Sequence, residues 1–513
     1  MRIVNAVMLC LLLSLGGTAL AQGTPPASQS VATPQPAASS QPEASSQSTP
    51  SSQPTPSSQP AASLPTASQQ PAATPSGPIA RDFPPGLQIP DAARPGPNFD
   101  VDKATEAYLN LLSPAQRQLS DAYFEGGYWL QLWQLMYGVA IGVFLLVSGI
   151  SVRMRDFAQG LVRWRWASTA IYALLWIVIG YLLGLPMDYY SDFVREHQYG
   201  LSTQDVGGWL WDSVKGTILA AVFLPLIVSL LYAAVRKSGA RWWIWASMGA
   251  FVLSLLVGMI APVFLEPIFN DYHPLPAGPV REAVLSLARA NRIPTQNVVW
   301  FNASKQTTRV SANVSGFLNT TQVSLNDNLV NRTSLPEIRA VLGHEMGHYV
   351  LNHALRLTIY FGLLITLVLF CVHRSLDWAL ARWGARLKLQ GRDDPAALPL
   401  AVIAFMVFMF LATPLSNSIT RQAEAEADAF GLNAAREPNG FAMSAMRLST
   451  YRKLQPSPLE EIVFYDHPSG YTRVHNSMIW LKENQDNPTA NAPIAPPMAP
   501  LIFAPTPTAA GGH

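Results

Sequence analysis

The chain has 513 residues, of which 49% are hydrophobic and 13% are charged, and its formal net charge is +2. These values are typical of an integral membrane protein, and they argue against a soluble domain and against a nucleic-acid-binding protein. The two cysteines, Cys10 and Cys371, both lie in apolar segments and provide no disulfide framework.

The two ends of the chain differ in composition from its middle. Residues 1–21 start with Met1-Arg2, continue as an apolar run and end in small residues, which predicts a secretory signal peptide cleaved after Ala21. An uncleaved anchor is the alternative. Residues 22–80 are rich in Ser, Pro, Gln, Ala and Thr, and residues 484–513 are rich in Pro and Ala. Such segments bury too little apolar surface to offset the entropy of ordering, so we expect a disordered tether and a disordered tail.

Six apolar stretches between these ends are long enough to span a bilayer. They cover residues 131–150, 167–185, 216–235, 242–264, 354–372 and 398–416. The first four lie in an N-terminal membrane region, 120–264. We therefore predict a mainly α fold, a polytopic membrane helix bundle with about six spans in addition to the signal.

Charged residues are unevenly divided among the short loops. The loops after the first, third and fifth predicted spans are basic, with Arg153, Arg155, Arg163, Arg165, Arg236, Lys237, Arg241, Arg374, Arg382, Arg386, Lys388 and Arg392. The connection at 186–215 is acidic instead. Basic loops stay in the cytoplasm, so we expect residues 265–353 and those after about 417 to lie on the extracytoplasmic side of a bacterial-type inner membrane. A signal peptide predicts the same orientation; amphipathic helices beside the membrane are the alternative cause of the bias.

The most informative motif is HEMGH at residues 344–348. On an α-helix, His344 and His348 are separated by only about 40°, so both imidazoles can reach one metal ion, and Glu345 lies where it can activate a water molecule. Ser334 and Glu337 fit a capping box at the start of this helix. The fifth span follows almost directly, so we expect the helix to continue into the membrane. Two packed core histidines are the alternative.

A hydrolytic zinc site takes three protein ligands, so a third must come from elsewhere. His353 lies about 180° round the predicted helix from His344 and is expected to be a packing or supporting residue. After the last span, Glu424 and Asp428 are four residues apart and share a helix face. Two membrane crossings separate them from His348, so the two helices can meet on one side of the membrane. A solvated acidic helix surface is the alternative.

The chain resembles the type 1 CAAX prenyl endopeptidase family and the related bacterial heat-shock membrane metallopeptidases over roughly residues 185–483. The resemblance depends on several motifs that recur in order: 200–204 (GLSTQ), 274–276 (PLP), 341–348 (VLGHEMGH), Asn417, Arg421, Glu424, Ala427, Asp428, His467, Pro468 and Arg473.

The resemblance implies one Zn²⁺ per chain with three ligands: His344, His348 and Glu424. It also implies that Glu345 is the general base and that Asp428 orients a ligating histidine. His467 and Arg473 would lie near the tetrahedral intermediate, where a donor or a positive charge stabilises the oxyanion. These residues would belong to an α+β zinc peptidase domain of the gluzincin type, 265–483, which includes the last two spans.

The sequence departs from the family in two respects. Ser311 stands where the family has Asn in a strand beside the substrate, although alternation at 310–314 and 322–325 still predicts short strands, and an extended substrate can pair with an edge strand. Eukaryotic members have seven spans and a site that faces the cytosol. Here the signal stands in place of the first span and the predicted orientation is reversed.

We interpret the chain as an integral-membrane zinc metalloendopeptidase that hydrolyses peptide bonds of peptide or membrane-protein substrates at the bilayer, in quality control or peptide processing. We expect misfolded or signal-derived membrane peptides as substrates. Prenyl-peptide processing is the first alternative. A non-catalytic membrane binding or transport protein with a structural metal is the second, and a tethered surface scaffold is the third. The sequence does not indicate an oligomeric state.

Overall fold

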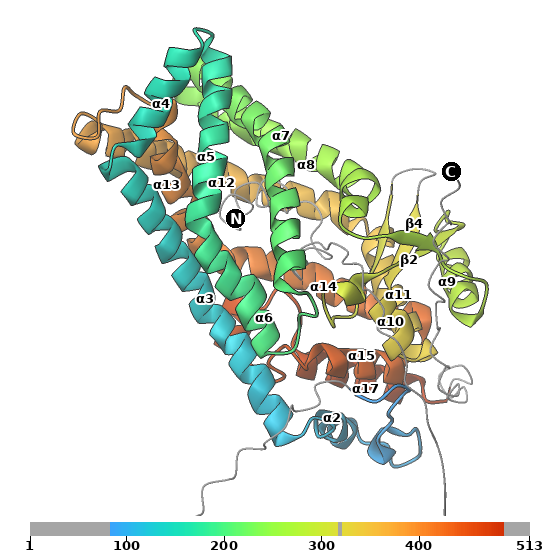
Figure 1. Ribbon diagram of the computed structural model, residues 1–513. Coiled ribbons are helices and arrows are strands. Elements are labelled where there is room, and N and C mark those ends of the chain that lie inside the picture. The colour runs from blue at the N-terminus through green and yellow to red at the C-terminus, as the bar shows by residue number, and fades with distance from the viewer. Residues whose placement is uncertain (1–82, 317–320, 487–513) are drawn as a thin grey trace, which may run out of the picture. The chain divides into compact units, whose positions relative to one another are not determined.

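Helices make up most of the computed structural model, which describes residues 83–316 and 321–486, all in one unit of the chain (Figure 1). The predicted signal peptide (1–21), the predicted tether (22–80) and residues 487–513 of the predicted tail lie outside the described residues. The described fold is mainly α with one small mixed sheet, as predicted.

The predicted spans all fall in helices. The helices that hold the predicted spans are α3 (Pro114–Val147), α5 (Arg165–Asp188), α7 (Val206–Ser238), α8 (Trp242–Ile260), α12 (His353–Trp383) and α13 (Leu398–Leu411). Shorter elements connect them: α4 (Ile150–Leu161), the π-helix η2 (Tyr189–Val194), α6 (Arg195–Gln198), η3 (Gly239–Arg241), the π-helix η4 (Ala261–Leu265), η5 (Glu266–Ile268) and η8 (Pro395–Ala397). Their capping residues agree with the sequence: Ser113 forms a capping box with Gln116 at the start of α3, and Asp205 caps α7.

Within residues 83–316 and 321–486, four helical stretches are long and apolar enough to cross a membrane: Pro114–Val147, Arg165–Gln198, Val206–Gly258 and His353–Trp383. A fifth is the pair Pro395–Leu411 and Thr413–Ala435 if these helices, which are bent by 53°, count as one span. This count is below the predicted six because the third and fourth predicted spans share the stretch Val206–Gly258. Within it, Gly239 has φ +53° and forms the turn after which α8 packs against α7.

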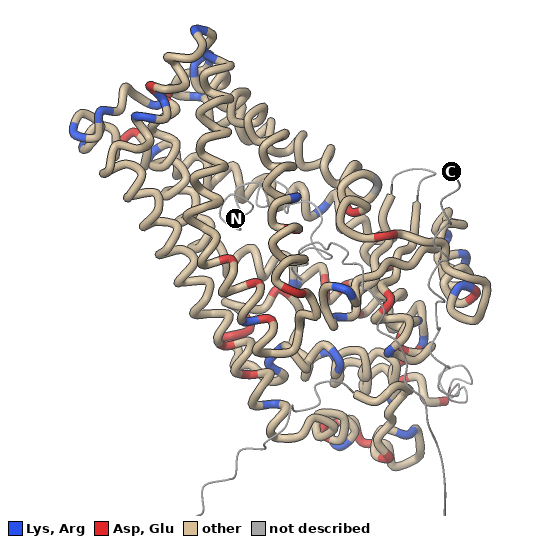
Figure 2. The backbone as a smooth tube through the Cα atoms, viewed as in Figure 1, with Lys and Arg blue, Asp and Glu red and all other residues tan. Residues whose placement is uncertain are grey.

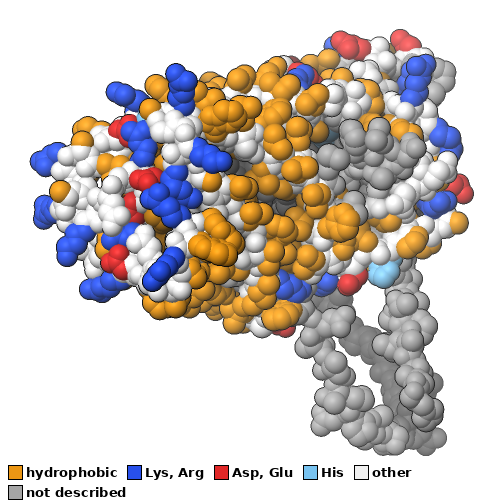
Figure 3. Space-filling model, turned by 90° about the horizontal axis from the view of Figure 1, so that it is seen from above, with side chains coloured by type: hydrophobic (Ala, Val, Ile, Leu, Met, Phe, Trp, Pro, Cys, Tyr) orange, Lys and Arg blue, Asp and Glu red, His pale blue; other side chains and the backbone are white. Residues whose placement is uncertain are grey.

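The surface of these helices is largely apolar, and most of their Lys and Arg residues gather at one end. Large side chains such as Trp133, Val178 and Leu363 are more than half exposed, which is costly in water and favourable in a bilayer. Figure 2 shows Lys and Arg concentrated at the end of the helices where α4 and the α7–α8 turn lie. Figure 3 shows the same separation from above: hydrophobic side chains cover the middle of the face and basic ones one end.

A four-stranded sheet lies beside the long helices, with the order β1-β2-β4-β3. Its strands and neighbouring helices are β1 (Tyr272–Pro274), α9 (Pro279–Ala290), β2 (Asn297–Phe301), η6 (Ala303–Lys305), β3 (Ala312–Ser315), β4 (Gln322–Asn326) and α10 (Asp327–Arg332). β2 and β4 are parallel and the other pairs are antiparallel, with Ala312 opposite Leu325 in β3–β4. The predicted strands are present as β3 and β4, and β3 is an edge strand. β1 and β2 were not predicted from the sequence.

The motif helix is α11 (Leu335–Val350), and its predicted capping box is present: the Ser334 amide donates to Glu337 Oε2 at 2.7 Å. The prediction that this helix continues into the membrane is wrong. It ends at Val350, Asn352 adopts a left-handed conformation with φ +53°, and a separate helix, α12, starts at His353. Asn tolerates this conformation because its short polar side chain can bond locally, so Asn352 allows the chain to end one helix and start the next.

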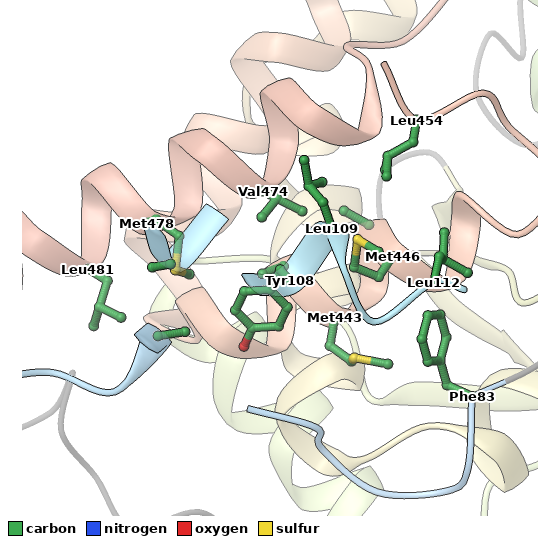
Figure 4. Packing of buried hydrophobic residues seen from close by; sticks show 14 residues of the cluster. Phe83, Tyr108, Leu109, Leu112, Met443, Met446, Leu454, Val474, Met478 and Leu481 are labelled. Carbon is green, nitrogen blue, oxygen red and sulfur yellow. The ribbon is translucent and has the colours of Figure 1, made fainter. Parts of the chain in front are cut away.

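The C-terminal helices complete the unit together with the N-terminal segment. They are α14 (Thr413–Ala435), α15 (Pro438–Leu448), α16 (Pro458–Phe464) and α17 (Gly470–Asn484), and the N-terminal segment contributes η1 (Asp91–Ala93) and α2 (Val101–Leu109). Tyr108 of α2 is fully buried between α15 and α17, against Met446 and Met478 (Figure 4). Arg447 of α15 donates to Glu337 Oε1 at 2.5 Å, so this core also supports the start of α11.

Candidate active site

The site forms where α11 crosses α14, and glycines let the two backbones approach. Gly343 and Gly347 of α11 face Gly431 and Ala427 of α14. A Cβ atom at Gly431 would lie only 2.7 Å from the backbone nitrogen of His344. The close approach therefore depends on the absence of side chains at the crossing, and it brings the acidic face of α14 to the histidines of the motif.

Three side chains converge at this crossing. His344 Nε2 lies 3.2 Å from Glu424 Oε2, His348 Nε2 lies 3.5 Å from Glu424 Oε1, and the two Nε2 atoms are 3.1 Å apart. One donor atom from each residue falls within 4.8 Å of the other two. Glu424 is fully buried, and its Oε1 accepts no hydrogen bond from any described residue. Two imidazole nitrogens and one carboxylate oxygen are the ligands of many hydrolytic zinc sites, so the residues fit a metal ion.

The second ring nitrogen of each histidine lies close to a polar atom of another side chain. His344 Nδ1 lies 2.8 Å from Asp428 Oδ1, and His348 Nδ1 lies 2.9 Å from His353 Nδ1. His353 is buried and continues to Glu426 at 3.3 Å. Such contacts fix the orientation of ligating imidazoles. His353 was expected to face away from the site, but the break at residues 351–352 turns it back, and it has the supporting place that was predicted for it.

Burial and the nearby charges determine the protonation states of His344, Glu345 and His348. Burial lowers the pKa of His344, but Asp428 and Glu424 outweigh it and raise the pKa to about 10. Burial and the charge of His344 lower the pKa of His348 to about 3, so His348 is neutral and its nitrogen is free to act as a ligand. Burial raises the pKa of Glu345 to about 7, the range that suits a general base at neutral pH.

His467 and Arg473 reach the same carboxylate from the C-terminal side. His467 Nε2 lies 3.2 Å from Glu424 Oε2, and its Nδ1 lies 2.7 Å from Asp466 Oδ1. Arg473 donates from Nη2 to Glu424 Oε2 at 3.1 Å and from Nε to Asp428 Oδ2 at 2.9 Å. The structure thus brings together every predicted site residue, and it places the Arg473 guanidinium on two carboxylates.

Asp466 also belongs to the site, although it was not predicted; its position directly before His467 is the sequence feature that could have indicated it. Burial raises the pKa of Asp466, but His467 outweighs it and lowers the pKa to about 2, so Asp466 is ionised and can orient the imidazole. The segment that carries the pair is held on α14, where Arg421 Nη1 donates to the carbonyl oxygens of Glu461 and Tyr465 at 2.6 and 2.5 Å. The same segment accepts a hydrogen bond from Asn417 at the Val463 carbonyl.

A cavity of about 90 Å³ lies between β3 and the site. Ser311 and Ala312 line one side, and Glu345, His467 and Arg473 line another. An edge strand beside a base and a polarising group is an arrangement that can hold an extended peptide by backbone pairing.

Comparisons with known proteins agree with this geometry. Residues 102–271 match the CAAX prenyl protease N-terminal domain, which has five membrane helices, and residues 274–478 match peptidase family M48. The chain is 30% identical over 340 residues to the uncharacterized metalloprotease YhfN of Bacillus subtilis, a match that covers 65% of this chain and 78% of that protein. The chain belongs to peptidase family M48. It is a multi-pass membrane metallopeptidase, a hydrolase, and its family implies a metal, generally zinc.

Other relatives carry more specific names. CAAX prenyl protease 1 of Saccharomyces cerevisiae is 28% identical over 347 residues, which cover 64% of this chain and 76% of that protein. The crystal structure of S. mikatae Ste24p superposes with a TM-score of 0.62 at 21% identity, and covers 72% of this chain and 90% of that one. At this identity the superposition shows a shared fold.

Proposed function

We propose that the chain is an endopeptidase with one zinc ion held by His344, His348 and Glu424. The observation that supports this most is the convergence of these three donors within 4.8 Å around a buried Glu424 oxygen that has no hydrogen-bond partner among the described residues. Metal analysis tests it: wild type should hold one zinc per chain, and Glu424→Ala should lose it. Full zinc occupancy in Glu424→Ala would overturn this ligand set.

A bound zinc ion would supply Lewis acidity, which polarises a carbonyl group and makes water more acidic. Glu345 accepts the proton of the attacking water and delivers it to the leaving amine, and its pKa of about 7 suits both steps. His467, oriented by Asp466, donates to the oxygen of the scissile carbonyl as negative charge develops there. The backbone of β3 holds the substrate in an extended form beside these groups.

The substrates that we propose are unprenylated apolar peptides, derived from misfolded membrane proteins or from signal sequences. The apolar helices α12 and α13, which contact the site helix α14, support this class. Processing of prenylated C-terminal peptides is the alternative, and the name of the Saccharomyces cerevisiae relative, CAAX prenyl protease 1, favours it. A panel of quenched peptides, each made with and without a farnesyl group, separates the two. Cleavage of the farnesylated forms alone would overturn the first proposal.

We also propose a bacterial-type inner membrane with the basic end of the helices in the cytoplasm and the site outside it, as positive-inside reasoning requires. Single cysteines test this in a chain that lacks Cys10 and Cys371. Exposed Leu459→Cys near the site should react with a membrane-impermeant maleimide in intact cells, and Arg386→Cys at the basic end should not. Labelling of Arg386→Cys and not of Leu459→Cys would show the opposite orientation in the membrane.

A further inference from the structure

A shallow basic groove, largely open to solvent, lies at the end of the helix bundle away from the site, between the start of α5 and the end of α7. Its lining consists of Trp164, Arg165, Trp166, Ala233, Arg236 and Lys237. The groove has a fixed frame, because Ser229 of α7 donates to the Trp166 carbonyl at 3.2 Å just below it.

The cations of the groove are largely available to a ligand. Neither Arg236 nor Lys237 forms an ion pair with a carboxylate of residues 83–316 or 321–486. Arg165 contacts Asp393 at 3.4 Å, but that pair is exposed to solvent, where it contributes little. Three positive charges therefore meet one carboxylate, so the groove favours an anion.

The surface directly beyond the groove is apolar. On α7, residues at helical spacing lead from the groove along one face: Lys237, Ala233, Leu230 and Leu226, the last two about 60% exposed. On α5, Trp166 continues to Leu174 and Val178 in the same way. Trp164 and Trp166 are 70% and 60% exposed, and exposed tryptophans of this kind lie at the boundary between headgroups and hydrocarbon.

A ligand that fits must carry a negative charge at one end and long apolar chains below it. We infer that the groove binds an anionic phospholipid, with its phosphate at Arg236 and Lys237 and its acyl chains along the Leu226–Leu230 face. The two cations attract the phosphate, the tryptophans flank the glycerol region, and the exposed leucines are covered by hydrocarbon. This site is independent of the peptidase reaction, because none of its residues lines the catalytic cavity.

Native mass spectrometry of the full chain in a nonionic detergent tests the inference. Phosphatidylglycerol and phosphatidylcholine with identical acyl chains are titrated onto the wild type and onto Arg236→Ala/Lys237→Ala. The double variant should bind phosphatidylglycerol roughly tenfold or more weakly, since each cation near an anionic headgroup contributes about fivefold, and its binding of phosphatidylcholine should not change. The charge-preserving swap Arg236→Lys/Lys237→Arg should bind like the wild type.

The matched control is Arg382→Ala/Arg386→Ala, which removes the same charge from exposed positions at the same end but outside the groove. It should change the affinity less than threefold. An equal loss in both double variants would mean a diffuse charge effect and would overturn the site. Wild-type affinity in the groove variant would overturn it too. Displacement of the lipid by an excess of inorganic phosphate alone would assign the groove to a small anion instead.

Discussion

Gly431→Ala should separate the two helices that carry the site. The added Cβ would lie 2.7 Å from His344 N and 3.0 Å from His344 Cα, whereas ordinary contact begins at 3.4 Å. Both of these atoms are backbone, so no side chain can move aside, and α14 must shift away from α11 by several tenths of an ångström. Overpacking of this kind costs about 1–3 kcal/mol in stability. The same shift moves Glu424 relative to His344 and His348.

Metal sites and reacting groups tolerate little displacement. We expect zinc affinity to fall roughly 10- to 100-fold, and kcat/KM in saturating zinc to fall up to about 100-fold. Zinc affinity is measured by competition with a chromophoric chelator, and kcat/KM with a quenched peptide. Gly249→Ala on α8 is the matched control, because nothing lies within 4 Å of its Cβ position, and both quantities should stay unchanged. Wild-type zinc affinity and activity in Gly431→Ala would refute the argument from close helix approach.

Three further outcomes follow from the contacts. Asp466→Asn should lower kcat roughly 10- to 100-fold with unchanged zinc content, because His467 loses the carboxylate that orients its ring. An unchanged kcat would contradict this role of Asp466. Arg447→Ala leaves the Glu337 carboxylate buried without its cation, so the free energy of unfolding, measured by thermal denaturation, should fall by about 3–5 kcal/mol. An unaltered melting temperature would contradict this stabilising role. Zinc must displace a proton from His344, whose pKa is about 10, so isothermal titration should give a zinc affinity that falls about tenfold per pH unit below pH 8. A zinc affinity independent of pH would contradict this, because it would mean that His344 is already neutral in the zinc-free protein.

Local patterns in the sequence predicted much of this fold. Apolar runs located the membrane helices, and the pair Ser334 and Glu337 located the start of α11. Local sequence patterns did not predict the elements that depend on tertiary contacts. Strands β1 and β2 have three and five residues and depend on pairing with partners distant in the sequence. The break before α12 depends on the single residue Asn352, and because helix-forming residues flank it on both sides, the sequence pattern does not indicate a break there.

The candidate site was predictable in its residue types but not in its geometry. Spacing alone placed His344 and His348 on one face, and topology allowed Glu424 to reach them. The crossing that brings them together depends on Gly431, whose role is visible only once the two backbones are placed side by side. Likewise, the contact of His353 with His348 follows from the helix break and not from helical spacing.

Metal-dependent proteolysis tests the central claim most directly. Purified, detergent-solubilised wild type and Glu345→Gln are compared on quenched peptides before chelation, after chelation and after zinc is added back, with zinc content measured in each sample. We predict that chelation abolishes wild-type cleavage and zinc restores it. Glu345→Gln should retain one zinc per chain but lose about 10²- to 10⁴-fold in turnover, because it cannot accept a proton. Full activity in zinc-loaded Glu345→Gln would contradict the role of Glu345, and zinc-loaded wild type that cleaves no peptide would contradict the proposed reaction.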